Sequence, residues 1–344
     1  MKIKIAWLTA IMALVASPVL AESGAPAVPQ FEVDAFWPKP LPNKWILGQV
    51  SGIATDRYDR IWVVHRPASL TPRERAAEQN PPEAKCCVAA PPVLVFDQSG
   101  NLLRHWGGPG EGFQWPQSEH GIFIDGNDFV WLAGNGKNDG QLLKFTMDGK
   151  FVLQIGKQGE GNDSNSTTRL GSPADVAVDV AAKEVFAADG YANRRVVVFD
   201  SETGHYKRHW GAYGKPPSDE KTPPYDPAKP PSQQFGNPVH CIRIDTNGLV
   251  YVCDRSNNRL QVFRKDGTFV AEHIYEKATR GTGSVYDLVF SPDQDQKRFG
   301  RPGRQIGQFT ALHDIAVDRQ GNIFTSEVNT GQRVQKFRRI DRQN

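Results

Sequence analysis

Three histidines occupy the same position of a repeated sequence pattern, although the chain contains only eight histidines. The pattern is a short alternation of apolar and polar residues that usually ends in aspartate. It occurs six times, as "SGIATD" from Ser51, "HGIFID" from His120, "ADVAVD" from Ala174, "HCIRID" from His240, "YDLVFS" from Tyr286 and "HDIAVD" from His313. Three imidazoles with a fourth position left open are typical of a catalytic zinc site. The three histidines are therefore candidate metal ligands, provided that the fold brings them together.

Short β-strands must position these histidines. After each segment except the fifth, a second and a third strand follow, and three units add a fourth strand, as in "GNLLRHWG". Units of this kind that recur at about 40–55 residues are typical of a β-propeller, in which each blade is a four-stranded meander. We therefore predict an all-β fold, a six-bladed β-propeller. A β-sandwich with accidental self-similarity is the alternative.

The fifth unit is too short to form a blade. Only 27 residues separate Tyr286 from His313, whereas a four-stranded blade needs about 40. We expect an innermost strand and little else, which makes this a truncated fifth blade. The last unit supplies three strands, and the N-terminal stretch "QFEVDAFW" from Gln30 alternates like a strand. It could complete the last blade and clasp the ring shut.

In a propeller the first strand of each blade lines the central channel, so equivalent positions form a ring around the axis. His120, His240 and His313 begin units two, four and six and should therefore point at one another from alternate blades. This arrangement predicts a tetrahedral zinc site that is open to water or substrate. Alternatively, the three are separate polar residues of the channel, hydrogen-bonded to water. The other histidines are interpreted as surface or packing residues: His65, His105, His205, His209 and His273.

Two arginines and a tyrosine follow the second strand of their units, beside the mouth of the channel. They are Arg66 in "VVHR", Tyr191 in "DGY" and Arg255 in "CDR". An arginine there could bind a carboxylate through two parallel hydrogen bonds. A tyrosine near zinc and arginine has its phenolate favoured and could act as a base. In the alternative interpretation the arginines are structural and the tyrosine packs.

The first residues predict a compartment. Residues 1–21 combine the basic start "MKIK", an apolar stretch and the small-residue site "VLA" before Glu22, which is the pattern of a secretory signal peptide; an uncleaved anchor is the alternative. We expect residues 22–344 to form a single propeller domain, a monomer that is secreted or periplasmic and free of the membrane after cleavage. A net charge of only +3 gives no indication of a nucleic-acid partner.

The four cysteines do not form a zinc pattern. Cys86 and Cys87 are adjacent, a spacing that rarely bonds without strain, and no paired C-x-x-C occurs. An oxidising compartment permits a bridge between Cys241 and Cys253, but the sequence leaves the pairing open.

These positions together resemble the lyase domain of the peptidylglycine α-amidating enzymes, peptidyl-α-hydroxyglycine α-amidating lyase, a six-bladed propeller of the NHL-repeat kind. The similarity extends from about Gly48 to Phe337, and its clearest pieces are "GQVSGIA", "HGIFID", "SPADVAVD", "DGYANRRVVVF", "DRSNNRLQVF" and "HDIAVD". Ala311 and Ala192 depart from the family, which has a methionine and a disulfide cysteine at these positions.

The resemblance implies a set of site residues. The catalytic Zn²⁺ would be held by His120, His240 and His313, with Tyr191 as the catalytic tyrosine and Arg66 and Arg255 as the active-site arginines. A structural Ca²⁺ is also implied in the channel, with ligands from the Asp314 carboxylate and from the backbone carbonyls of Ile53 and Ile122.

The expected activity is cleavage of the C–N bond of an α-hydroxyglycine-type carbinolamide to an amide and glyoxylate. The substrate would be a small molecule or peptide that bears a carboxylate. Two alternatives stay open: a zinc-dependent hydrolase or lyase acting on another small hydroxylated compound, and a non-catalytic secreted binding propeller. The calcium lactonase propellers are a weaker rival, because they coordinate through Glu, Asn and Asp where this channel offers imidazoles.

Overall fold

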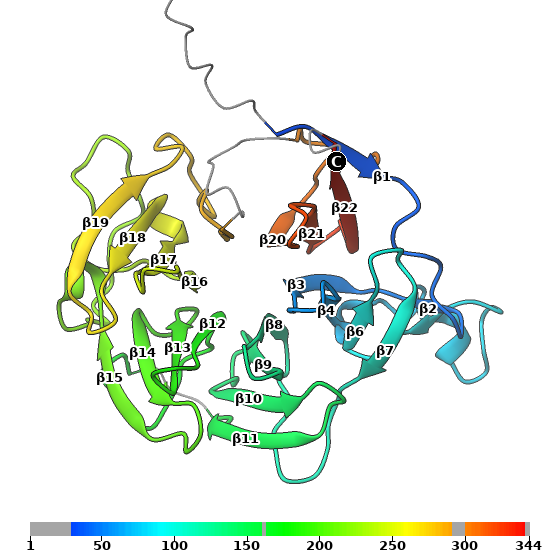
Figure 1. Ribbon diagram of the computed structural model, residues 1–344, viewed down its shortest axis with the longest axis horizontal. Coiled ribbons are helices and arrows are strands. Elements are labelled where there is room, and N and C mark those ends of the chain that lie inside the picture. The colour runs from blue at the N-terminus through cyan, green and yellow to red at the C-terminus, as the bar shows by residue number, and fades with distance from the viewer. Residues whose placement is uncertain (1–28, 160–162, 291–299, 341–344) are drawn as a thin grey trace, which may run out of the picture.

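The repeated segments form the innermost strands of a ring of sheets (Figure 1). The computed structural model describes residues 29–159, 163–290 and 300–340. Within these ranges, five four-stranded antiparallel sheets surround a central axis. The predicted all-β propeller is confirmed, with a sixth sector that is incomplete.

The blades follow one another along the chain, each running from the axis outward. The first contains β3 (Gln49–Thr55), β4 (Ile61–Arg66), β6 (Val93–Phe96) and β7 (Leu102–Trp106). The second contains β8 (Glu119–Ile124), β9 (Phe129–Gly134), β10 (Gln141–Thr146) and β11 (Phe151–Gly156). The third contains β12 (Asp175–Asp179), β13 (Glu184–Asp189), β14 (Arg195–Asp200) and β15 (Tyr206–Trp210).

The fourth blade contains β16 (Val239–Ile244), β17 (Val250–Asp254), β18 (Arg259–Phe263) and β19 (Phe269–Ile274). Its outer strand, β19, was not identified in the sequence. Small elements decorate the ring between these strands: the parallel pair β2 (Trp45–Ile46) and β5 (Val88–Ala89), and the short 3₁₀ turns η1 (Pro67–Ser69), η2 (Ala76–Glu78), η3 (Ala212–Gly214) and η4 (Arg255–Asn257).

The last sheet joins the two ends of the chain. It orders β20 (Leu312–Val317), β21 (Ile323–Glu327), β22 (Arg333–Arg339) and β1 (Phe31–Asp34) from the axis outward. β1 pairs antiparallel with β22, with Val33 opposite Phe337, and Figure 1 shows the blue strand beside the red one. The prediction that the N-terminal stretch completes the last blade is therefore confirmed.

The fifth unit differs from what the sequence predicts. Between β19 and β20, the described residues contain an isolated bridge from Pro302 to Phe309 but no strand. The expectation of an innermost strand was wrong for the described part of this unit, residues 286–290, because the unit supplies no second strand to pair with it. The described residues between the blades of β19 and β20, 275–290 and 300–311, are irregular chain (Figure 1).

The aspartate that closes a segment has a structural role in the turn that follows, as Asp125 and Asp56 show. Asp125 Oδ1 accepts hydrogen bonds from the backbone N–H groups of Asn127 and Phe129, and its Oδ2 accepts one from Trp131 Nε1 at 2.9 Å. Asp56 forms the same set with its own turn and with Trp62 Nε1 at 2.8 Å. These carboxylates satisfy turn donors and fix buried tryptophans between blades, so they are not available to the site.

Both cysteine pairs are disulfide-bonded. Cys241 and Cys253 lie directly opposite each other on β16 and β17, which settles the pairing that the sequence left open. Cys86 and Cys87 are also bonded, across a cis peptide bond. The sequence left the state of this adjacent pair open as well, although such a spacing rarely bonds.

The predicted signal peptide, residues 1–21, lies outside the described residues. None of the helices in the described part of the chain has the length and hydropathy of a membrane span.

Trp37 provides a test of the clasp that closes the ring. Its side chain is 5% exposed, and its ring centroid lies 5.7 Å from Phe96 of the first blade and 5.1 Å from Phe324 of the last. We expect Trp37→Ala to lower the free energy of unfolding by about 3–5 kcal/mol, the usual cost of removing a large buried aromatic. Deletion of residues 22–40 should cost more. Denaturant unfolding measures both.

The neighbouring Phe36 is the matched control, since its side chain is 79% exposed. Phe36→Ala should change the free energy of unfolding by less than about 0.5 kcal/mol. Equal effects of the two substitutions would contradict a clasp that depends on the packing of Trp37.

Candidate metal centre

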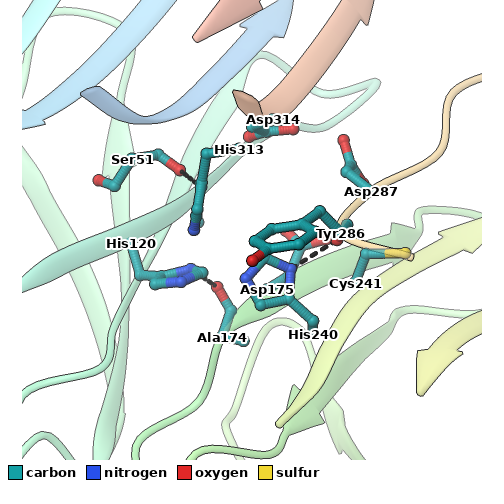
Figure 2. Close-up of a pocket in the computed structure, with 11 residues that line it drawn as sticks. Ser51, His120, Ala174, Asp175, His240, Cys241, Tyr286, Asp287, His313 and Asp314 are labelled. Atoms are coloured by element: carbon teal, nitrogen blue, oxygen red, sulfur yellow. Dashed lines mark hydrogen bonds between the residues drawn. The ribbon is translucent and has the colours of Figure 1, made fainter. Parts of the chain in front are cut away.

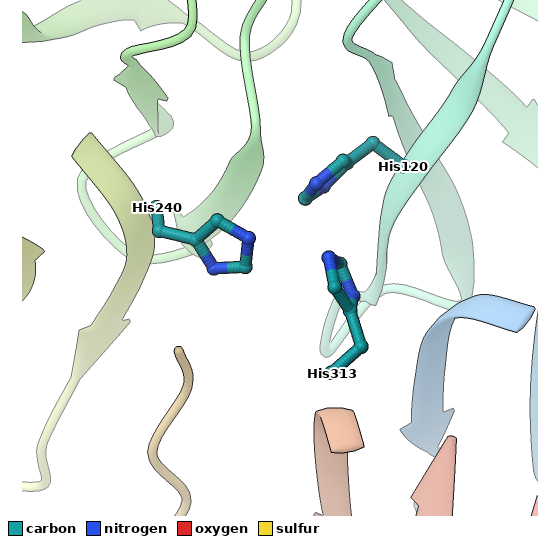
Figure 3. Close-up of side chains that lie close together, drawn as sticks. All are labelled: His120, His240 and His313. Atoms are coloured by element: carbon teal, nitrogen blue, oxygen red, sulfur yellow. The ribbon is translucent and has the colours of Figure 1, made fainter. Parts of the chain in front are cut away.

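The three repeat histidines meet on the axis of the ring. Figure 3 shows His120, His240 and His313 turned toward one another from three blades. One ring nitrogen from each lies within 4.8 Å of the other two, and the ring centroids are 4.7–5.0 Å apart. All three side chains are at most 4% exposed. Their predicted convergence is therefore observed, and the cluster could bind a metal ion.

A local irregularity aims each histidine at the axis. The pairing of β16 with β17 shifts register between Val239 and Cys241, so His240 has no direct partner across the ladder. Equivalent shifts occur around His313 in β20 and around His120 in β8. β-Bulges of this kind redirect side chains and are common beside functional sites. The regular alternation of side chains along a strand would not by itself direct these three imidazoles at the axis.

Each imidazole is held by the innermost segment of the next sector. Nδ1 of His120 bonds the carbonyl oxygen of Ala174 at 2.8 Å, and Nδ1 of His313 bonds that of Ser51 at 2.8 Å. Nδ1 of His240 bonds the carbonyl oxygen of Tyr286 at 2.5 Å. Ser51, Ala174 and Tyr286 are the first residues of segments one, three and five. The even segments thus supply imidazoles and the odd segments supply the carbonyls that orient them.

These contacts fix the tautomer of all three rings. A carbonyl oxygen only accepts hydrogen bonds, so Nδ1 must carry the proton and Nε2 keeps its lone pair. Nε2 of His240 is buried without a hydrogen-bond partner among the described residues. Three Nε2 lone pairs therefore face one region, which is the donor set of a His₃ metal site with second-shell carbonyls.

Burial keeps the imidazoles neutral. It is the main cause that lowers the pKa of His313 to about 3, and the positive charge of Arg66 lowers it further. Burial also holds the pKa values of His120 and His240 well below the ordinary value, with help from the neighbouring histidines. Neutral imidazole is the form that binds metal ions.

Tyr191 lies beside this cluster, as predicted. Its hydroxyl is 2.9 Å from Nε2 of His120 and accepts a hydrogen bond from Arg255 Nη1 at 3.3 Å. Burial raises the pKa of Tyr191 and outweighs the opposing charges of Arg255 and Arg66. The two arginines alone therefore do not favour the phenolate, and the expectation that zinc and arginine together favour it stays a prediction.

Arg66 is firmly fixed at the end of β4. Its Nε donates to the carbonyl oxygen of Glu119 at 2.7 Å, Nη1 donates to Gln49 Oε1 at 3.0 Å and Nη2 donates to Asn135 Oδ1 at 3.2 Å. All three acceptors are neutral, so these hydrogen bonds position the guanidinium without cancelling its charge.

Arg255 makes fewer hydrogen bonds than Arg66 and lies against the rings of two tyrosines. Its guanidinium lies 4.7 Å from the ring centroid of Tyr286 and 5.7 Å from that of Tyr191. Its Nε is buried and has no hydrogen-bond partner among the described residues. A guanidinium held between two aromatic faces with a donor to spare suits an anionic ligand.

Tyr286 is a site residue that sequence reasoning missed. It belongs to the incomplete fifth sector, yet its carbonyl orients His240 and its ring packs against the imidazoles of His240 and His313, with centroid distances of 5.4 and 6.1 Å. The signal was available, since Tyr286 stands at the same repeat position as the three histidines. Figure 2 shows it over the cluster.

A second polar layer lies next to the imidazoles along the axis. The cavity between the two layers is lined by Ser51, His120, Gly121, Ala174, Asp175, His240, Cys241, Tyr286, Asp287, His313 and Asp314 (Figure 2). Gly121 permits close approach of two blades here, because a Cβ atom on it would lie 2.5 Å from the carbonyl oxygen that orients His120.

The carboxylate implied for calcium, that of Asp314, is already engaged. Asp314 Oδ2 accepts a hydrogen bond from the N–H of Ile53 at 3.0 Å, and its Oδ1 lies 3.6 Å from Arg243 Nη2. The calcium ion stays a prediction, but the residues present here fit a second cation poorly beside that guanidinium.

Comparisons with known proteins agree with this architecture. An NHL repeat matches residues 239–263, which span β16 to β18. NHL repeat-containing protein 3 of Mus musculus is 26% identical over 247 residues, and the alignment covers 69% of this chain and 58% of that protein. Peptidyl-glycine alpha-amidating monooxygenase B of Xenopus laevis is 27% identical, with 76% of this chain and 27% of that protein covered.

A probable peptidyl-alpha-hydroxyglycine alpha-amidating lyase of Caenorhabditis elegans is 26% identical, with 64% of this chain and 57% of that protein covered. The alignments thus span little more than half of two of these relatives and about a quarter of the amidating monooxygenase. The NHL-repeat propeller inferred from the resemblance is confirmed, and the chain is related in sequence to both groups. Its specific identity as an amidating lyase stays a prediction.

Among solved structures, a catalytically inactive virginiamycin B lyase from Staphylococcus aureus has a similar fold. The superposition covers 90% of this chain and 88% of the lyase chain. The sequence identity is 12% and the TM-score is 0.49. This likeness is too distant to bear on function.

The histidine cluster predicts metal binding that can be measured directly. We expect purified protein to take up one zinc ion per chain from zinc-containing buffer. His240→Ala should lower the affinity for zinc by about 100-fold or more, because loss of a ligand should cost at least as much as loss of a group that orients a ligand. Elemental analysis and competition with a chromophoric chelator provide both values. The exposed His273 on β19 supplies the control, His273→Ala, and identical zinc contents in both variants would contradict the site.

The neutral imidazoles also predict a pH dependence of the metal-free protein. Because the pKa of His313 is about 3 in the folded state and about 6.5 in an unfolded chain, the unfolded state gains a proton first as the pH falls. The contribution of His313 to the free energy of unfolding is fully present above pH 6.5 and is lost as the pH falls toward 3. At pH 5 the loss from this residue should be about 2 kcal/mol.

The measurement is the free energy of unfolding of chelator-treated protein at pH 7 and pH 5. Wild type should lose about 2 kcal/mol more than His313→Gln between these two values. Parallel pH profiles for the two proteins would show that His313 does not have the depressed pKa.

Proposed function

We propose that this protein is a metal-dependent lyase that cleaves the C–N bond of an α-hydroxyglycine-type carbinolamide. The main support is one juxtaposition: three neutral imidazoles share an axial point beside the Tyr191 hydroxyl, and Arg66 and Arg255 carry no carboxylate partner among their described hydrogen bonds. The relationship to proteins named as amidating enzymes supports the choice of reaction.

The Nε2 atoms of His120, His240 and His313 would hold the metal ion, which we propose to be zinc because all three donors are imidazoles. A zinc ion so held would supply Lewis acidity toward a substrate hydroxyl. The channel residues themselves keep the imidazoles neutral and oriented through the three carbonyl contacts described above.

Tyr191 would move the proton. As phenolate, its oxygen takes the proton of the α-hydroxyl, the carbon–oxygen double bond forms, and the C–N bond breaks with its electron pair on nitrogen. The phenol then returns the proton to that nitrogen, which gives the amide and glyoxylate and restores the phenolate. Arg255 and Arg66 offset part of the charge on the phenolate, and a bound zinc ion would supply the further positive charge that outweighs the cost of burial.

Arg255 would hold the substrate carboxylate. Its Nε has no partner among the described residues, and its guanidinium lies between the rings of Tyr191 and Tyr286, which leaves a donor for the carboxylate. We further propose that the protein acts outside the cytoplasm, on the pattern of residues 1–21. The calcium ion implied by the resemblance plays no part in this proposal.

The activity predicts a simple assay. Zinc-loaded protein should release glyoxylate from an N-acyl-α-hydroxyglycine faster than the spontaneous reaction. Tyr191→Phe should lower kcat by about 100-fold or more, the usual loss for a general base or acid, while zinc content stays unchanged. The hydroxyglycine derivative is added as substrate, and the glyoxylate released is measured colorimetrically.

Tyr206 gives the matched control, because its hydroxyl contacts His209 on the outer strand β15 and lies outside the channel. Tyr206→Phe should retain the wild-type rate. Absence of glyoxylate from wild type with zinc confirmed would reject the reaction and favour another substrate, whereas absence of bound zinc would favour a binding propeller.

A further inference from the structure

The second polar layer of the channel contains a cation that the protein supplies itself. Arg243 stands three residues after His240 in the segment "HCIRID", and its side chain, 14% exposed, extends among three aspartates. Asp175, Asp287 and Asp314 are the second residues of segments three, five and six. One guanidinium from the fourth blade thus meets carboxylates from three other sectors of the ring.

The contacts show an ion cluster with a single positive centre. Nη1 of Arg243 bonds the carboxylate of Asp175. Nη2 lies 2.9 Å from Asp287 Oδ1 and 3.6 Å from Asp314 Oδ1. The three carboxylates are at most 10% exposed, so they would repel one another strongly without this charge.

Backbone donors complete the cluster. Asp175 accepts a hydrogen bond from the N–H of Ile242 at 3.1 Å, and Asp314 accepts hydrogen bonds from the N–H groups of Ile53 at 3.0 Å and Ile315 at 2.8 Å. Each of these bonds except the last joins two different blades. The three carboxylates therefore hold blades together, and the positive charge of Arg243 offsets the repulsion among them.

We propose that the Arg243 guanidinium is a built-in cation on the channel axis, and that this propeller closes its ring around it without a calcium ion. The place matches the one for which the resemblance implies calcium, since Asp314 is common to both. A divalent ion there would face a fixed positive charge and a carboxylate whose oxygens are already shared.

The charge of Arg243 also helps to hold the incomplete fifth sector in place. The segment from Ser284 to Phe290 has no strand ladder to hold it, yet Asp287 is drawn to the axis by Arg243. Asp287 follows Tyr286, whose carbonyl orients His240. Together with the N–H of Ile315, which donates to Asp287 Oδ2 at 3.3 Å, Arg243 therefore tethers the fifth sector to the ring, independently of which reaction the metal centre performs.

The test compares the melting temperature of zinc-loaded protein in calcium-depleted buffer with its melting temperature after addition of about 5 mM CaCl₂. This concentration is enough to saturate structural calcium sites of extracellular modules. We expect wild type to melt at the same temperature in both and to carry no stoichiometric calcium by elemental analysis. A rise of several degrees with calcium, or one bound calcium per chain, would overturn the proposal.

A variant tests the charge itself. Arg243→Gln should melt several degrees lower than wild type and lower than Arg243→Lys, which keeps a positive charge among the carboxylates. Arg57→Gln is the control, because Arg57 pairs with Asp128 on the exposed surface. Wild-type stability in Arg243→Gln would overturn the proposal, and the calcium measurement on wild type decides the matter even if this variant does not fold.

Discussion

The metal centre depends on hydrogen bonds between sectors of the ring. Each histidine takes its tautomer and direction from a backbone carbonyl of the following sector, as His313 does from Ser51 across the junction of the last and first blades. No single blade contains both parts of such a pair. The donor set therefore exists only after the ring has closed, so binding of a metal ion would stabilise the closed ring as well as the site.

The sequence predicts the fold well because its signals are local. Alternation, turn residues and the repeat interval are sufficient to define the innermost strands, and the strand "FEVD" of β1 could be assigned to the last blade because that blade lacked one strand. The adjacent disulfide of Cys86 and Cys87 could not be decided from the sequence, because it needs a backbone geometry that spacing does not show. The irregular fifth sector shows that a repeat motif alone does not make a strand.

The site is predicted in part, for a related reason. Equivalent repeat positions bring His120, His240 and His313 to one axis without any knowledge of distances. The pKa of Tyr191 could not be foreseen, because burial and the two arginines oppose each other and only the structure shows that burial prevails. Arg243 was overlooked because its partners lie in sectors that are far apart in sequence.

The alternation of roles around the ring explains which sector could be lost. Sectors two, four and six contribute imidazoles, for which no other side chain is an equal substitute. Sector five contributes one main-chain oxygen, that of Tyr286, to the orientation of His240, and any residue can offer that atom from a loop. Erosion of this sector in evolution would thus leave the ligand set intact, whereas the same loss in a neighbouring sector would remove a ligand and with it the centre.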